Sequence, residues 1–188
     1  MWEYRLWHNL QPHPANQAGR VWTEKIIHRF SAQDGGEPSS GVILGTSGTL
    51  YGTTVGGIHG YGCAYELKPS ANGKWKETVL YGFTEEDKNG GDPEAAFVRD
   101  SAGNLYGTSN VGGGESRWGN VFRLSHQRKG KWSFSVLYGF ANGIPDGEAP
   151  AAPLIFDKAG NLYSTTQDGG SGTGCSFYGC GTVFEVSP

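Results

Sequence analysis

Four short sequence motifs recur three times in the same order, with a period of about 55 residues. The first, W-x3-[IV]-[IL]-[HY]-x-F, begins at Trp22, Trp75 and Trp132. The others are [DN]-G-x-x-P from Asp34, Asn89 and Asp146, G-[TN]-L-Y-[GS]-T from Gly48, Gly103 and Gly160, and G-x-[AV]-[YF]-x-[LV] from Gly62, Gly119 and Gly181. A repeat of this length restricts the chain to a repetitive architecture, because each unit needs neighbours against which to bury its apolar face.

Each motif predicts a short β-strand. β-Branched and aromatic residues dominate the first motif, and the runs Asp100–Asn104 and Asp157–Asn161, each with a glycine, favour tight hairpin turns. No stretch shows sustained helical periodicity. The 32 glycines suit many turns, and the 24 aromatic residues exclude a disordered chain. We expect an all-β fold, and four short strands per repeat are typical of a β-propeller blade.

The repeat resembles the GloVer tandem repeat of secreted bacterial proteins over about residues 21–188. The run from Pro150 to Tyr163, PAAPLIFDKAGNLY, is also similar to the NHL blade and to the gluconolactonase/paraoxonase-type blade. The resemblance implies three four-stranded blades after an N-terminal tail, residues 1–20. The implied strands are A at 41–45, 95–99 and 152–156, B at 49–54, 104–109 and 161–166, C at 63–68, 120–125 and 182–187, and D at 22–30, 75–83 and 132–140.

Three blades cannot close a ring, because propellers typically have four to eight. The implied chain opens with a D strand, residues 22–30, and its last blade has no D strand of its own. We therefore expect two chains to join head to tail as a six-bladed homodimer, each D strand completing the last blade of its partner. The alternative is a fragment of a longer propeller.

Charge is distributed unevenly over the predicted loops. The D–A loops (31–40, 84–94 and 141–151) and the B–C loops (55–62, 110–119 and 167–181) should share one face of the ring. They hold 11 of the 18 acidic residues, but of the 15 basic residues only Lys88 and Arg117.

The net charge of −3 gives no basis for nucleic-acid binding. No apolar run approaches 18 residues, so we expect no membrane span.

Concentrated carboxylates beside Gly-rich loops suit a hard cation, and Ca²⁺ binds six to eight oxygen ligands. The candidate metal ligands are Asp34, Asp92, Glu94 and Asp146. Glu94 opens strand A and resembles in position the channel-mouth oxygen ligands of the gluconolactonase family, so it is also a candidate catalytic residue. The first and third repeats have Ser39 and Ala151 there. The alternative for these acids is an ordinary role in solvated turns.

Other loop residues suggest catalysis and substrate contact. His59 lies in the Gly-rich loop 55–62 and is a candidate general base, or else a surface histidine without a role. Trp118, Tyr178 and Tyr61 are candidates for a platform under a sugar ring or an acyl chain. Cys175 and Cys180 predict a disulfide, which is consistent with an extracellular setting, whereas Cys63 should be a small buried residue.

The resemblance implies a Ca²⁺-dependent hydrolase of small lactones or esters, with acyl-homoserine lactones as one candidate substrate. The alternative is a non-catalytic module that binds glycans or cell-surface partners through the same loops. A secreted or periplasmic location is expected, although the first residues lack the apolar core of a signal peptide.

Overall fold

The computed structural model describes residues 21–57, 60–84, 89–112, 118–141, 145–175 and 178–188. This part of the chain is all-β, with four small antiparallel sheets and no α-helix. It contains no helix long and apolar enough to cross a membrane. The expectation of an all-β fold is therefore confirmed.

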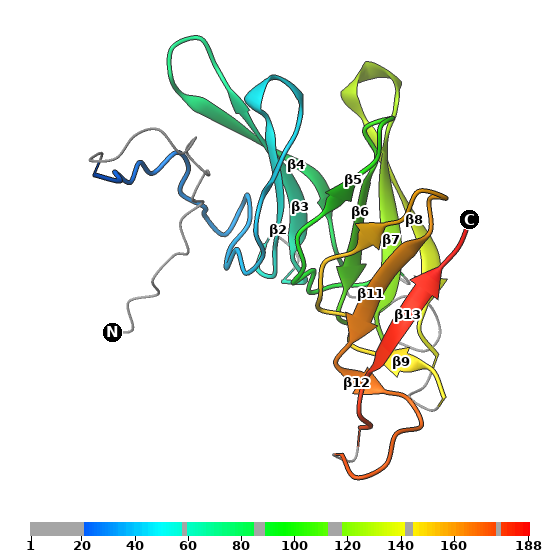
Figure 1. The fold of residues 1–188 in the computed structure, drawn as a ribbon. Coiled ribbons are helices and arrows are strands. Elements are labelled where there is room, and N and C mark those ends of the chain that lie inside the picture. Colours follow the sequence, from blue (N-terminus) through cyan, green and yellow to red (C-terminus); the bar gives the residue numbers. More distant parts are fainter. Residues whose placement is uncertain (1–20, 58–59, 85–88, 113–117, 142–144, 176–177) are drawn as a thin grey trace, which may run out of the picture.

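Three of the sheets repeat one strand order (Figure 1). The first sheet contains β1 (Ile43–Leu44), β2 (Leu50–Thr54), β3 (Cys63–Pro69) and β4 (Trp75–Gly82). The second contains β5 (Val98–Arg99), β6 (Leu105–Ser109), β7 (Asn120–His126) and β8 (Trp132–Gly139). Of the described strands, the third contains only β10 (Ile155–Phe156), β11 (Leu162–Thr166) and β13 (Thr182–Val186). Short 3-10 turns, Thr46–Gly48 and Arg128–Gly130, lie in two connections. The fourth sheet pairs β9 (Gly147–Glu148) with β12 (Asp168–Gly169).

The repeat extends to the details of strand pairing. β3 pairs with β4 and β7 with β8 over equivalent residues, and each pair has a register shift at the same place, between Ala64 and Tyr65 and between Val121 and Phe122. Equivalent side chains therefore face equivalent neighbours in both sheets.

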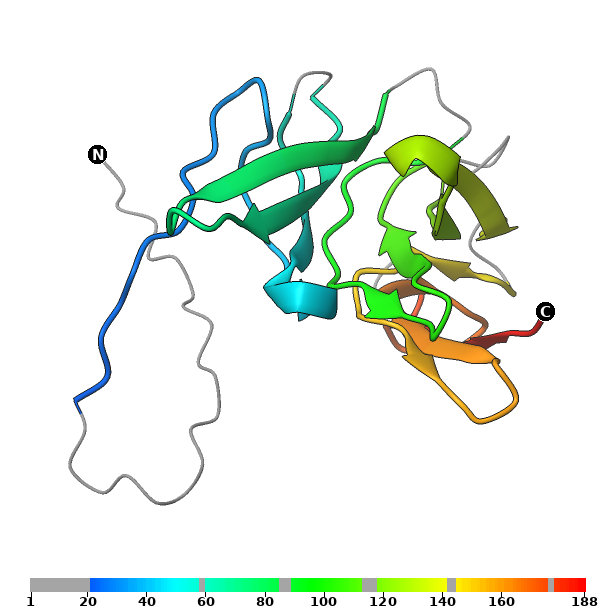
Figure 2. The same ribbon diagram turned by 90° about the horizontal axis from the view of Figure 1, so that it is seen from above.

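The apolar core lies between neighbouring sheets, which follow one another in a row (Figure 2). Between the first and second sheets, Phe83, Phe97 and Phe122 are buried with residues of both. Between the second and third, Val121 meets Phe140, Leu154 and Leu162. Each sheet is thus stabilised through its neighbour, because its own strands are too short to enclose a core.

The phenylalanine that ends the first motif makes the same contact three times. Phe30 packs edge-on against Tyr65 at 4.8 Å between ring centroids, Phe83 against Phe122 at 5.5 Å, and Phe140 against Phe184 at 5.0 Å. In each repeat the end of an outer segment is therefore held by the third strand of the sheet that follows it.

Residues 22–30, for which an outer strand is expected, form no strand within the single chain. At the end of this segment, the Phe30 ring packs against Tyr65 of the first sheet. The physical reason is that a strand needs a partner edge. The first sheet has its fourth strand in β4, and the edge of β13 with which no described strand pairs lies at the other end of the row (Figure 1).

Candidate functional site

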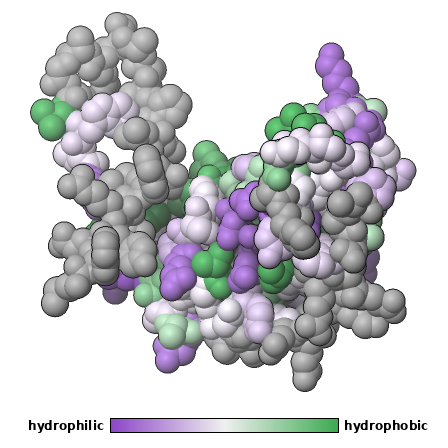
Figure 3. Space-filling view, turned by 90° about the horizontal axis from the view of Figure 1, so that it is seen from below, coloured by the Kyte–Doolittle hydropathy of each residue, from purple (hydrophilic) through white to green (hydrophobic). Residues whose placement is uncertain are grey.

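The D–A and B–C loops lie together at one end of the sheets and form what we call the loop face, consisting of the described residues of 31–40, 55–62, 84–94, 110–119, 141–151 and 167–181. In every repeat one loop of each kind is joined by a backbone bridge: Gly36 to Gly56, Gly91 to Val111, and β9 to β12. Small hydrophobic and hydrophilic areas lie side by side on this face (Figure 3). The loops are thus held by backbone bonds, as a positioned site requires.

A non-glycine residue with positive φ precedes the proline of each D–A loop. Glu37, Asp92 and Ala149 have φ of 52°, 50° and 55°. Their carbonyl oxygens accept hydrogen bonds from the backbone N–H groups of Val55, Asn110 and Gln167 at 3.3, 3.2 and 3.1 Å. Ala149 has the same conformation but no functional group in its side chain. The left-handed backbone at these positions is therefore explained by the hydrogen bond between the two loops rather than by a side-chain role. It also fixes the direction in which the Asp92 side chain leaves the loop.

Asp34 is engaged within its own loop. Its Oδ1 accepts hydrogen bonds from the Ser31 N–H at 2.6 Å and the Ser31 hydroxyl at 2.9 Å, and its Oδ2 lies 3.4 Å from Nε2 of His28. Partial burial raises the pKa of Asp34, but the Ser31 hydrogen bonds and the His28 charge outweigh it, so the pKa is lowered overall. A cation ligand at this position would compete with these contacts.

Asp146 occupies the equivalent position in the third repeat and is held in the same way. Its Oδ2 accepts hydrogen bonds from the Tyr138 hydroxyl and the Ala141 N–H, both at 2.8 Å. In the second repeat this position is Asn89, whose side-chain amide donates to the Tyr81 hydroxyl at 2.9 Å. All three residues therefore tie a D–A loop to the outer segment that precedes it.

Asp92 and Glu94 are the predicted ligands that the structure brings together. Burial, and then the charge of Glu94, raise the pKa of Asp92. Two carboxylates that repel in this way lose that cost when a cation binds. No group of three or more His, Cys, Asp or Glu side chains within the described ranges is arranged to hold a metal ion. Asp92 and Glu94 would thus need further oxygen ligands for a Ca²⁺ site.

The predicted aromatic contacts divide into two kinds. Tyr61 and Trp118 are half-buried and pack against the two core clusters, and their carbonyl oxygens accept hydrogen bonds from the backbone N–H groups of Asp92 at 3.0 Å and Ala149 at 3.1 Å. Tyr178, in contrast, is 60% exposed on the loop face. His59, the candidate base, lies outside the described residues.

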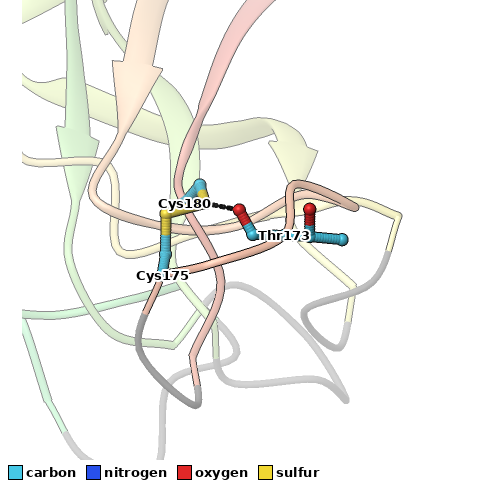
Figure 4. The surroundings of a disulfide bond; sticks show 3 residues. All are labelled: Thr173, Cys175 and Cys180. Carbon is cyan, nitrogen blue, oxygen red and sulfur yellow. Dashed lines mark hydrogen bonds between the residues drawn. A yellow bond between two sulfur atoms is a disulfide. The ribbon is translucent and has the colours of Figure 1, made fainter.

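Cys175 and Cys180 form the predicted disulfide, with Cα atoms 5.2 Å apart (Figure 4). The bond closes the loop that carries Tyr178. Cys63 is free and buried, as expected. Its Sγ lies 3.2 Å from the Thr54 hydroxyl and 3.4 Å from the Asp34 carbonyl oxygen. Burial raises the pKa of this thiol, which disfavours the thiolate that a nucleophile would need.

Sequence reasoning missed two carboxyl groups whose pKa is raised. Glu148 lies opposite Asp168 in the β9–β12 pair, and burial together with Asp168 raises the pKa of Glu148. Glu77 lies on β4, where burial and then Asp34 raise its pKa to about 7. Its Oε1 is buried without a hydrogen-bond partner among the described residues. The sequence contained one indication for Glu77. The equivalent residue of the second sheet is the apolar Phe134, which suggests that this position of the repeat is not fully solvated.

Comparison with curated proteins found no match. Residues 15–188, by contrast, match a family described as the Gloeobacter/Verrucomicrobia repeat. The match includes all three copies of the four motifs and all the described strands. The chain belongs to the Gloeobacter/Verrucomicrobia repeat family.

Proposed function

We propose that the three main sheets are blades of a β-propeller and that two chains, joined head to tail, complete a six-bladed ring. The support is the exposure at both ends of the row. Val183 of β13 is 82% exposed, whereas its equivalents Val121 and Ala64 are fully buried against the next sheet. At the other end Leu50 is half-buried, whereas its equivalents Leu105 and Leu162 are buried. Each end thus presents the apolar surface that internal sheets bury.

We propose that the loop face of this ring binds a carbohydrate or a similar ligand of a cell surface, without catalysis. The observation that carries this function is the exposed Tyr178 ring on a loop that a disulfide and backbone bonds to Gly169 restrain. An exposed, restrained aromatic ring offers contact area at little entropic cost. The disulfide favours a secreted or periplasmic location.

The test is glycan-array screening of the purified chain, followed by calorimetric titration of the best ligand. Tyr178→Ala should weaken binding about 10-fold or more, because the stacking surface is lost. Tyr178→Phe is the matched control and should retain most of the affinity. Equal affinity of the Ala and Phe variants would contradict the role of the ring, and an array without any bound glycan would contradict the binding function.

Ca²⁺-dependent hydrolysis of small lactones or esters is the second candidate, which the Asp92–Glu94 pair favours. Asp34 and Asp146 are held in loop hydrogen bonds, so Asp92 and Glu94 are the better candidate ligands, with His59 as the candidate base. The resemblance of the repeat to gluconolactonase-type blades also supports this second candidate. In this hydrolase a bound Ca²⁺ would polarise the substrate carbonyl.

Calcium titration and hydrolysis of an acyl-homoserine lactone test the second candidate. Asp92→Asn with Glu94→Gln should abolish both Ca²⁺ binding and turnover. Glu37→Gln is the matched control, because Glu37 occupies the position of Asp92 in the first repeat. Wild-type protein that hydrolyses no lactone or ester with Ca²⁺ would remove this candidate.

A further inference from the structure

We infer that residues 22–30 of one copy add as a fourth strand to the outer edge of β13 in a second copy, and that the two copies exchange these segments reciprocally. This inference rests on the proposed two-chain ring and names the contact that closes it.

Among the described residues, the third sheet has no counterpart of the strand that completes the other two. β4 and β8 pair with β3 and β7, whereas no described strand pairs with the outer edge of β13. The effect reaches the neighbouring sheet. Tyr81 of β4 is half-buried and stacks on Phe134 at 4.4 Å, but its equivalent Tyr138 of β8 is 41% exposed. The residue of the third sheet that would cover Tyr138 lies on the missing strand.

The end of residues 22–30 is held like the end of an outer strand from a preceding sheet. Phe30 packs on Tyr65 as Phe83 packs on Phe122, so the residues before Phe30 leave the first sheet where β4 leaves the second. Ile26, the equivalent of Val79 on β4, is 49% exposed. This segment and the edge of β13 lie at opposite ends of the row (Figures 1 and 2). Residues 22–30 therefore cannot pair with β13 of the same chain. In a closed two-fold arrangement of two chains, each segment can pair with β13 of the other chain.

The repeat fixes the register of this pairing. Cys63 lies opposite Gly82 and Asn120 opposite Gly139, so Thr182 should lie opposite Arg29 of the second copy. The same register places Ile26 opposite Phe184, as Val79 is opposite Tyr65. It also places Lys25 opposite Glu185. Directly opposite residues of an antiparallel pair interact across the ladder, and opposite charges there are favourable.

Reciprocal exchange predicts a distinctive result for charge reversal. Each contact between residues 22–30 of one copy and β13 of the other is called a seam, and the dimer has two. In the Lys25→Glu homodimer, like charges face each other at both seams, and the same holds for the Glu185→Lys homodimer. In a heterodimer of the two variants, opposite charges face each other at both seams. At one seam the two charges are exchanged between the strands, and at the other Lys25 of the Glu185→Lys variant faces Glu185 of the Lys25→Glu variant, as in the wild type.

The two seams of that heterodimer follow from the pairing. At one seam the segment of the Lys25→Glu variant pairs with the edge of the Glu185→Lys variant, so a glutamate faces a lysine. The other seam joins the unchanged Lys25 to the unchanged Glu185. Each variant alone should therefore dimerise about 25-fold more weakly, from about fivefold at each of two seams. An equimolar mixture should regain wild-type affinity.

The measurement is native mass spectrometry with analytical ultracentrifugation on the full chain, with one variant isotope-labelled. Both residues are exposed in the single chain, so the variants should fold normally. Lys158→Glu, on an exposed turn, is the control and should dimerise as the wild type does. Ile26→Asp should abolish the dimer, because it places a charge against Phe184.

Two results would overturn the inference in different ways. A wild-type chain that sediments as a monomer at all concentrations would remove the two-chain ring and this contact with it. A stable dimer that neither reversal weakens, or that the mixture does not restore, would leave the ring standing and reject the exchange of residues 22–30.

Discussion

Glu77 should make the stability of the protein fall as the pH rises through neutrality. Its carboxyl group has a pKa of about 7 in the folded chain, above the ordinary 4.5, because burial and Asp34 disfavour the charged form. Below about pH 4.5 the group is protonated in both states and makes no difference. Between pH 4.5 and about 7 the unfolded chain loses the proton first, so unfolding becomes progressively easier. Above about pH 7 the penalty is complete.

The size of the penalty follows from the shift. A pKa difference of this size corresponds to at most about 3 kcal/mol. The residue is only partly buried, and solvent screens part of its charge, so we expect about 1 to 2 kcal/mol. Glu77→Gln removes the titration at nearly constant volume. The variant should match the wild type at about pH 4 and exceed it by about 1 to 2 kcal/mol at about pH 8.

Urea unfolding followed by tryptophan fluorescence, at fixed protein concentration and at several pH values, measures this difference. With an m-value of about 2 kcal/mol/M, the midpoints at about pH 8 should differ by about 0.5 to 1 M. Glu37→Gln, on the exposed loop, is the control and should run parallel to the wild type. Parallel profiles for wild type and Glu77→Gln would refute the reasoning.

Three further perturbations test the packing and the loop contacts. Phe83→Ala should lower the free energy of unfolding by about 3 to 5 kcal/mol, because a fully buried ring between two sheets is removed; calorimetry measures it. Cys175→Ser with Cys180→Ser should cost about 2 kcal/mol, because the loop that the disulfide closes is short. Asp146→Ala should cost about 1 to 3 kcal/mol, because it leaves the Tyr138 hydroxyl and the Ala141 N–H without their acceptor.

Controls separate these effects from general damage. Leu137→Ala, at a more exposed position of the second sheet, should cost clearly less than Phe83→Ala. Reduction of the wild type should reproduce the loss in the double serine variant. A loss for Asp146→Ala no larger than for Lys158→Ala would contradict its role as a loop anchor.

The strands of all three main sheets could be predicted, because the same apolar pattern packs in the same way each time. Leu105 and Leu162, for example, follow equivalent turns and are both buried. The outer strand expected at residues 22–30, by contrast, does not form within the single chain. A strand depends on a partner edge, and the sequence does not show whether that edge belongs to the same chain.

The candidate site was less predictable than the fold. Composition identifies acidic loops, but it does not show that Asp34 and Asp146 already accept hydrogen bonds from their own loops. The Cys175–Cys180 pair could be predicted, because its short spacing lies within one loop. Glu77 was missed because a charged residue on a strand is usually solvated, whereas its Oε1 is buried without a hydrogen-bond partner among the described residues.

The three phenylalanine contacts also determine how the fold can come apart. Phe83 belongs by sequence to the end of one sheet but is buried with the residues of the next, and Phe140 repeats the arrangement. A sheet that unfolds alone would therefore withdraw an aromatic ring from the core of its neighbour. Such nearest-neighbour coupling makes the row cooperative, so amide hydrogen exchange in β7 should report the opening of β3 as well as its own.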